Sequence, residues 1–377
     1  MRARTRTEPD RAATPLELFF DLCFVVAVSL AAARLHHSFT EDHVGPGLLG
    51  YLMVFFAIWW AWMNFTWFAS AYDTDDGPYR LATLVQMAGA LVMAAGVPAA
   101  FDRNDFLVVT LGYVIMRFAM VGQWLRAARA DEVRRHTARC YAVGITVVQA
   151  LWLARLALPG TWGIVGFVVL ALAEVAVPAW SERREQTTWH PGHIAERYGC
   201  FTLIVLGEVV LGTTAALQHA FDEGHHLGPL ISLAAAGIVI VFSMWWLYFD
   251  ESAEELLGDL SSGLRWGYGH YVVFASVAAV GAGLEVSVDY DSGNTRLGPL
   301  AAGYVTAVPI AVFLFMVWLL HVVPRNPAGW RRWSFPAVAL LVLIAPFGPA
   351  PIHVIAVLLA ALVVVTTLQG SRSRAEV

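Results

Sequence analysis

The chain has 377 residues, of which 58% are hydrophobic and only 14% are charged. Soluble domains carry about 25% charged residues, so this balance excludes an ordinary soluble protein and indicates a membrane protein. The net charge of −5 is small for the length, and all 24 basic residues are arginine. We therefore expect the lipid bilayer as a partner and no nucleic acid. The three cysteines, Cys23, Cys140 and Cys200, are scattered in or near apolar segments and do not indicate a disulfide framework.

The first 14 residues form a basic tail that precedes an apolar run. A cleaved signal peptide is one interpretation, with Ala31–Ala33 as its cleavage site, but Glu17 and Asp21 would interrupt the hydrophobic region. Thr14 and Pro15 instead predict the start of a helix, with Thr14 as its N-cap and Glu17 at the capping-box position. Capping is accordingly the simplest role for Glu17.

Apolar segments of about the length that a bilayer requires recur along the whole chain. Twelve are predicted, at residues 15–37, 47–70, 80–100, 105–127, 137–157, 161–180, 193–219, 228–249, 265–286, 298–322, 334–348 and 351–369. The eleventh is short and flanked by proline, so the last pair could instead form a re-entrant hairpin. The sequence predicts an all-α, polytopic transmembrane helix bundle.

The arginines are distributed unequally over the connections between these segments. With the N-terminus inside, the cytoplasmic connections and helix ends hold Arg80, Arg126, Arg129, Arg134, Arg135, Arg139, Arg183, Arg184, Arg265, Arg325, Arg331 and Arg332, and the outer ones hold Arg34, Arg103, Arg155 and Arg296. Cytoplasmic loops of membrane proteins are enriched in arginine and lysine. This asymmetry predicts a plasma (inner) membrane protein with both termini in the cytoplasm.

Two stretches at a constant offset of 186 residues indicate an internal repeat. Trp59–Asn64 and Trp245–Asp250 both contain two tryptophans, an aromatic and a terminal polar residue, and each leads into an acidic connection. Chance similarity between aromatic-rich segments is the alternative. The predicted organisation is a basic cytoplasmic tail (1–14), two tandem six-span repeats (15–182 and 190–369), a linker between them (183–189) and a cytoplasmic C-terminal tail (370–377). Tandem repeats of six spans share one orientation in the membrane.

Three long motifs resemble the bacterial low temperature requirement A (LtrA) family. They are LELFFDLCFVVAVSLAA (Leu16–Ala32), WWAWMNFTWFASAYDTDD (Trp59–Asp76) and HIAERYGCFTLIVLGEVVL (His193–Leu211). The resemblance spans nearly the whole chain and implies a multi-pass plasma-membrane protein associated with growth in the cold. It implies no established reaction, substrate or catalytic residue, so a mechanism has to come from the residues themselves.

Ionisable residues inside apolar spans are the strongest functional signal. A charged residue at the centre of a span costs about 2.5–3.5 kcal/mol on insertion scales, so it usually has a partner and a role. Asp21, Arg117 and Glu208 lie inside predicted spans, and they form a candidate transport site together with Asn64 and Asp250. Arg117 could pair with Glu208 or Asp21 for purely structural reasons, but two acids against one arginine favour a proton or ion relay.

Other polar residues give weaker signals. Glu174 is interpreted as an interfacial residue that reaches the membrane surface. His193, Glu196 and Arg197 are polar residues at the start of the seventh span and are candidates for the mouth of a pathway, although ordinary helix-start residues would look the same. Histidines and acids in two outer connections suggest transition-metal capture or pH sensing, but no spacing among them specifies a site. These residues are His36, His37, His43, Glu41, Asp42, His219, His225, His226, Asp222 and Glu223.

No nucleophile elbow, phosphate-binding loop, zinc-protease helix or haem-attachment pair occurs in the sequence. We therefore expect no enzyme and no cofactor. The leading hypothesis is a secondary transporter of an unknown small solute or ion, coupled to protons through Asp21 and Glu208. The alternatives are a non-transporting sensor or accessory protein for envelope adaptation to cold and, less favoured, a membrane-embedded enzyme acting on lipids.

Overall fold

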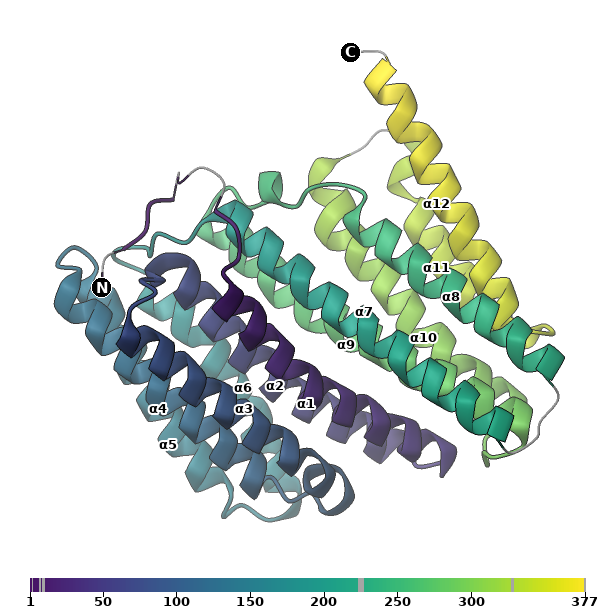
Figure 1. The fold of residues 1–377 in the computed structure, drawn as a ribbon, viewed down its shortest axis with the longest axis horizontal. Helices are drawn as coiled ribbons and strands as arrows, with labels where there is room; N and C mark the ends of the chain where they lie inside the picture. The colour runs from purple at the N-terminus through teal and green to yellow at the C-terminus, as the bar shows by residue number, and fades with distance from the viewer. Residues whose placement is uncertain (2, 7, 9–10, 223–226, 327–328, 376–377) are drawn as a thin grey trace. The chain divides into compact units, whose positions relative to one another are not determined.

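The structure is a computed structural model that describes residues 1, 3–6, 8, 11–222, 227–326 and 329–375. Within these residues it contains helices and no strand (Figure 1). The α-helices are α1 (Pro15–Thr40), α2 (Val44–Tyr72), α3 (Gly77–Arg103), α4 (Leu107–Ala130), α5 (Arg135–Arg155), α6 (Gly160–Ser181), α7 (Pro191–Asp222), α8 (Leu227–Phe249), α9 (Leu260–Ser292), α10 (Pro299–Val317), α11 (Ser334–Ile344) and α12 (Pro351–Ala375). Each predicted apolar segment therefore corresponds to a helix.

Eleven of these helices are long and apolar enough to cross a membrane, within the residues that are described. The exception is α11, which continues only as a short 3₁₀ turn (Ala345–Phe347). The prediction of a polytopic all-α bundle is confirmed, and the short eleventh segment has the length that the sequence indicated. Turn chemistry explains several helix starts: Asp76 accepts a hydrogen bond from the Tyr79 amide at the start of α3, and Asp259 forms a capping box with Ser262 at α9.

Close packing divides the chain into two compact units. The first comprises residues 1–31 and 49–201, and the second comprises residues 32–48 and 202–377. The borders fall inside α1, α2 and α7, whereas the predicted linker at 183–189 lies within the first unit.

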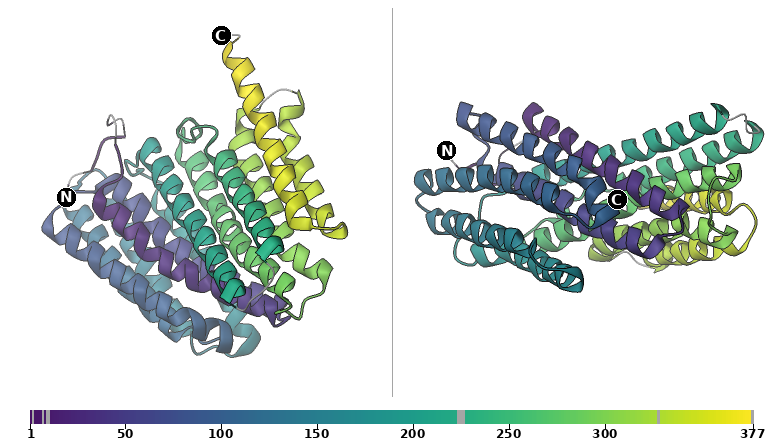
Figure 2. Two further views of the ribbon diagram at one scale, coloured as in Figure 1. Left: turned by 45° about the vertical axis from the view of Figure 1, so that its right-hand side comes forward. Right: turned by 90° about the horizontal axis from the view of Figure 1, so that it is seen from below.

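In the first unit, α3 to α6 pack in sequence order, each against the next (Figures 1 and 2). The α3–α4 contact is very close because glycines face each other: a Cβ at Gly112 would lie 2.3 Å from the Met93 nitrogen and 2.6 Å from the Gly89 oxygen. Small residues permit such approach between membrane helices. Three tryptophans of α2 are part of the core: Trp59, Trp60 and Trp62 are at most 2% exposed.

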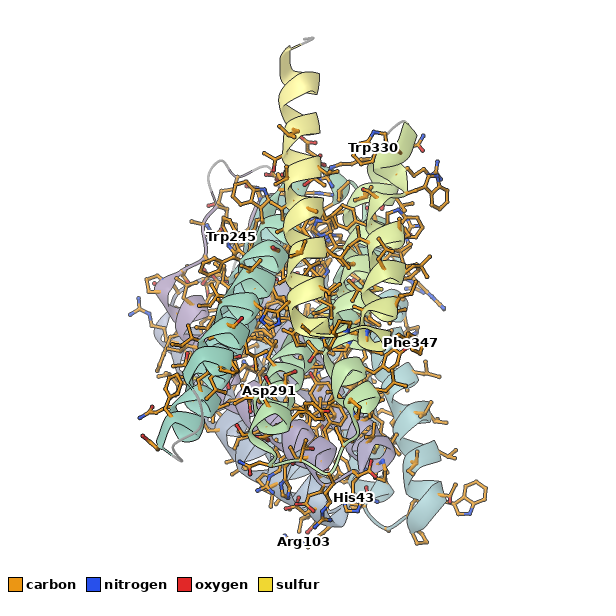
Figure 3. The ribbon with its side chains drawn as sticks, turned by 90° about the vertical axis from the view of Figure 1, so that its right-hand side faces the viewer. His43, Arg103, Trp245, Asp291, Trp330 and Phe347 are labelled. Atoms are coloured by element: carbon orange, nitrogen blue, oxygen red, sulfur yellow. The ribbon has the colours of Figure 1, made fainter. Side chains whose placement is uncertain are left out.

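In the second unit, α9 packs against α10, α10 against α11, and α8 against α12. α9 is the most enclosed of the candidate spans, with 78% of its apolar window buried. α10 runs directly into a π-helical segment (Trp318–Val322) and a 3₁₀ turn (Val323–Arg325). Two large apolar side chains of this unit are exposed: Trp245 of α8 is 44% exposed, and Phe347, just after α11, is 71% exposed. Both are labelled in Figure 3.

Candidate functional site

The first turns of α1 place two carboxylates on one face of the helix. The Thr14 amide donates a hydrogen bond to Glu17 Oε2 (2.8 Å), and the Glu17 amide donates to Thr14 Oγ1 (3.3 Å), which confirms the predicted capping box. Residues four apart share a helix face, so Asp21 lies one turn beyond Glu17. Both residues are fully buried. Capping is therefore only part of the role of Glu17.

The first turns of α7 place a histidine and an arginine against these carboxylates, again four residues apart. Arg197 donates from Nε to Asp21 Oδ2 (3.1 Å) and from Nη2 to Asp21 Oδ1, and its Nη1 lies 3.1 Å from Glu17 Oε1. His193 Nε2 lies 3.2 Å from Glu17 Oε1. All four side chains are fully buried. We refer to Glu17, Asp21, His193 and Arg197 as the α1–α7 cluster.

Aromatic side chains of α2 and α7 enclose the α1–α7 cluster. Trp62 Nε1 donates a hydrogen bond to Asp21 Oδ1 (2.7 Å), and the Trp62 ring packs against Phe201 and, edge-on, Tyr198. The Arg197 guanidinium lies 5.9 Å from the centre of the Phe65 ring. Arg11 and Asp73, which are both buried, also interact electrostatically with Glu17. Because these groups are buried, their mutual interactions are strong and each unbalanced charge is costly.

The α1–α7 cluster has an odd charge balance. Two carboxylates face one guanidinium, so the four groups carry one net negative charge when His193 is neutral. One added proton, on the imidazole or on a carboxyl group, makes them neutral. His193 Nδ1 has no hydrogen-bond partner within the described residues. The cluster is therefore chemically able to take up and release a single proton.

Arg117 belongs to a different buried ion pair from those predicted. Its Nη2 donates to Glu174 Oε2 (3.0 Å) and to the Tyr113 hydroxyl, whereas the partners considered from the sequence were Glu208 and Asp21. Glu174 is 1% exposed, so its interpretation as an interfacial residue is wrong. The indole nitrogens of Trp60 (2.8 Å) and Trp152 (3.2 Å) also donate to this carboxylate. The Glu174 carboxylate thereby connects side chains from α2, α4, α5 and α6, which indicates that its role is to hold these helices together.

Glu208 lies in the part of α7 that belongs to the second unit, and its carboxylate is close enough to Glu285 of α9 to interact electrostatically. The Glu285 carboxylate occupies the space beside Gly212, where an added Cβ would lie 2.1 Å from Oε1. Next to it, His36 Nε2 is 2.7 Å from Asp289 Oδ2, and His36 Nδ1 is 3.6 Å from Glu285 Oε2. Glu285 and Asp289 were not among the residues predicted to form a site. For Glu285 the sequence does contain a signal, because this carboxylate lies inside the ninth predicted apolar segment, near its end.

The remaining predicted site residues are not gathered at one place. The Asn64 amide donates to the Trp60 carbonyl (2.7 Å), Glu196 is exposed and accepts from the Ala13 amide (3.1 Å), and Asp250 lies exposed at the end of α8. His225, His226 and Glu223 lie outside the described residues. Within the described part of the chain, no three metal-ligating side chains come together. Of the predicted mouth residues, the structure places His193 and Arg197 with Asp21 and leaves Glu196 at the surface.

The long apolar helices with charged groups buried among them define a polytopic helical membrane protein. A model of the family described as "Bacterial low temperature requirement A protein (LtrA)" matches residues 12–368, and the chain belongs to this family. It is also 26% identical over 342 residues to "Uncharacterized protein RA0937" of Rhizobium meliloti (strain 1021), a match that covers 85% of this chain and 80% of that protein. The α1–α7 cluster lies within the matched range.

Proposed function

We propose that the chain is a proton-coupled secondary transporter of the plasma membrane, with the α1–α7 cluster as its proton-binding group. One observation carries the proposal: four ionisable side chains with an unequal charge balance are fully buried inside two candidate spans. Ionisable residues within membrane spans often form proton relays. The proposal involves no chemical reaction, and both termini are assigned to the cytoplasm.

The geometry supports exchange of one proton without loss of the fold. Arg197 contacts both Glu17 and Asp21, so protonation of one carboxyl group leaves the guanidinium paired with the other. His193 contacts Glu17 and provides a second place for the proton. A structural ion pair such as Arg117–Glu174 has equal numbers of opposite charges and lacks this freedom.

We also propose that the chain consists of two tandem repeats. The pairs α3–α4, α4–α5 and α5–α6 have counterparts in α9–α10, α10–α11 and α11–α12. Gly96 of α3 lies against the α4 backbone, and Gly283 of α9, 187 residues later, lies against the α10 backbone. The environments of the repeated tryptophans differ, since Trp59 is 2% exposed and Trp245 is 44% exposed. Two repeats can keep the same helix packing while the exposure of equivalent side chains differs, so this difference is compatible with a repeat.

The test is proton flux in vesicles. The full chain is reconstituted into liposomes that enclose a pH-sensitive dye, and a small-molecule fraction from cells is added outside. We expect a solute-dependent pH change with the wild-type protein and none with Asp21→Asn. The matched control is Asp75→Asn, which removes the same charge from an exposed pair with Arg80 and should leave the flux unchanged.

Two results would contradict the proposal. The first is a wild-type protein that gives no solute-dependent pH change beyond empty liposomes, as a non-transporting accessory protein would. The second is an Asp21→Asn variant with the wild-type flux, which would remove the α1–α7 cluster from any proton pathway. Folding of each variant is checked by thermal unfolding in detergent, so that loss of flux is not confused with loss of protein.

A further inference from the structure

A small aromatic cavity of about 30 Å³ lies in the first unit, at the end where α4 begins and α5 ends. The charged residue of its wall is Arg155, and the other lining side chains are mostly apolar. The aromatic part of the wall consists of Phe56, Phe106, Tyr113, Trp152 and Phe167. The cavity lies within one compact unit and contains no member of the α1–α7 cluster. Its volume accommodates about two water-sized groups.

Arg155, the last residue of α5, is a buried cation without an acidic partner. It is 7% exposed, and no carboxylate of the described residues lies within interaction range of its guanidinium. The buried arginines Arg117 and Arg197, by contrast, each contact a carboxylate. A buried charge without a counter-charge is unfavourable. An anion that enters the cavity would therefore interact strongly with Arg155.

Neighbouring groups hold the Arg155 side chain and leave its two terminal nitrogens free. Nε donates a hydrogen bond to the Gly163 carbonyl (2.8 Å), and the side-chain stem fills the space beside Gly166, where an added Cβ would lie 3.5 Å from Arg155 Cγ. Nη1 and Nη2 have no hydrogen-bond partner within the described residues, and neither nitrogen is closed off from solvent. Paired N–H groups of this kind match the two oxygens of a carboxylate.

Aromatic rings cover the Arg155 guanidinium. Its central carbon lies 5.0 Å from the centre of the Phe106 ring, 5.1 Å from that of Phe167 and 5.6 Å from that of Trp152. Cation–π contacts stabilise the charge without supplying an oxygen to the N–H groups. The rings also reduce the local dielectric, which strengthens an interaction with an anion. They give the cavity an apolar surface beside its single cation.

We infer that this cavity binds the carboxylate group of a monocarboxylic acid with an apolar chain. The two carboxylate oxygens accept hydrogen bonds from Arg155 Nη1 and Nη2, and the first carbons of the chain contact the aromatic wall. The rest of the chain extends out of the cavity. A lipid phosphodiester is not the ligand indicated, because its tetrahedral phosphate carries two ester groups and needs more room than the cavity offers. The inference concerns binding and does not depend on the proposed transport.

The test is calorimetric titration of the full chain in a non-ionic detergent and a carboxylate-free Tris buffer. Sodium hexanoate is the probe, hexanamide is the neutral molecule of the same shape, and dihexanoylphosphatidylglycerol supplies the phosphodiester of a lipid headgroup. We expect saturable binding of hexanoate and weaker binding of the other two molecules. Arg155→Gln should weaken hexanoate binding by roughly tenfold to a hundredfold, because it removes a charge-assisted contact with two oxygens.

The variants separate a site from general surface charge. Arg155→Gln leaves no carboxylate unpaired, so we expect it to fold, which thermal unfolding checks. Arg155→Lys keeps the buried charge but lacks the paired N–H groups, and it should bind hexanoate more tightly than Arg155→Gln and more weakly than the wild type. Arg103, labelled in Figure 3, is exposed at the end of α3 and does not line the cavity, so Arg103→Gln should bind as the wild type does.

Four results would overturn the inference. The first is an absence of saturable hexanoate binding by the wild type. The second is equal binding of hexanamide, which would show that the charge has no role. The third is tighter binding of dihexanoylphosphatidylglycerol than of hexanoate, which would indicate a lipid headgroup. The fourth is an equal loss of binding in Arg103→Gln and Arg155→Gln, as general surface charge would produce.

Discussion

Arg197 donates hydrogen bonds to both carboxylate oxygens of Asp21, which lies 176 residues earlier in the chain. The two residues close the contact between the first turns of α1 and α7 and are both fully buried. Glu17 contacts the same guanidinium. The two acids and the arginine therefore contribute differently to stability.

Asp21→Asn and Arg197→Gln should have unequal effects on folding. In Asp21→Asn the guanidinium keeps Glu17 as a counter-charge, so we expect a loss of stability below about 2 kcal/mol. In Arg197→Gln two buried carboxylates lose the guanidinium that contacts both of them, a change that costs about 3–5 kcal/mol in soluble proteins. Membrane yield and thermal unfolding in detergent measure the difference. Equal losses for the two variants would contradict this account.

The Arg117–Glu174 pair should behave as a structural pair. Glu174→Gln leaves a buried guanidinium without its carboxylate, and we expect the yield of folded protein to fall sharply. Replacing Arg117 by Gln in the same protein removes the unbalanced charge and should restore much of the yield. The double-variant cycle is the measurement. A double variant that is less stable than both single variants would show that the pair is not the cause.

The close α3–α4 contact predicts opposite effects for two glycines of α4. Gly112→Ala would place a Cβ 2.3 Å from the Met93 nitrogen and must push the helices apart, so we expect destabilisation of about 1–3 kcal/mol or more. Gly122 has nothing within 4 Å of its added Cβ, and Gly122→Ala should be neutral or stabilise the helix by up to about 1 kcal/mol. Thermal unfolding of the two variants in one detergent compares them. Similar midpoints would refute the packing argument.

Glu182 lies just beyond α6, outside the candidate spans, and predicts a pH dependence of stability. Burial raises the pKa of its carboxyl group, even though Tyr141 and the Thr187 amide and hydroxyl donate hydrogen bonds that favour the charged form. The folded state therefore holds this proton more tightly than the unfolded state. The stabilisation is complete below the unfolded pKa, about 4.3, and is lost as the pH rises through the folded pKa.

The measurement for Glu182 is the difference in unfolding free energy between the wild type and Glu182→Gln at several pH values. We expect this difference, wild type minus variant, to fall as the pH rises above about 4.3. Glu132→Gln is the control, since Glu132 is 84% exposed and should give a flat difference. A difference that rises with pH would mean that the hydrogen bonds outweigh burial.

The arginine distribution predicts the topology. Reporter fusions after Arg129 and Arg184 should be active only in the cytoplasm, and fusions after Asp42 and Asp222 only outside. All four positions lie at or near helix ends or in the connections between helices. The reverse pattern at either pair would invalidate the orientation and the assignment of both termini to the cytoplasm.

Much of the fold was predictable because a membrane-spanning helix requires a long run of apolar residues, which can be recognised in the local sequence. Long apolar runs gave the helices, and Thr14 with Glu17 gave the start of α1. Helix lengths were less accessible: α9 continues to Ser292, beyond its predicted end at residue 286. This is why Asp289 was not recognised as part of a cluster with His36, whereas Glu285 lies inside the predicted segment and only its neighbours were unknown.

The pairing of charges was not predictable, because periodicity gives the face of a helix but not its neighbour. The sequence left open whether Arg117 pairs with Asp21 or Glu208, and its partner is Glu174, 57 residues away on α6. Arg197 was assigned to a mouth because it lies near a helix start. The packing of α1 against that turn encloses it instead.

The shortness of α11 has a consequence for the lipid around it. From Ser334 to Phe347 the apolar segment reaches only about 21 Å, against roughly 30 Å for a typical hydrocarbon core. Leu340, Ile344 and Phe347 are exposed along it, so this face is open to acyl chains. Such a mismatch is relieved by local thinning, at fractions of a kcal/mol per Å. Lipids with short or disordered acyl chains should therefore collect beside α11, and the helix should sort the protein towards thinner regions of the membrane.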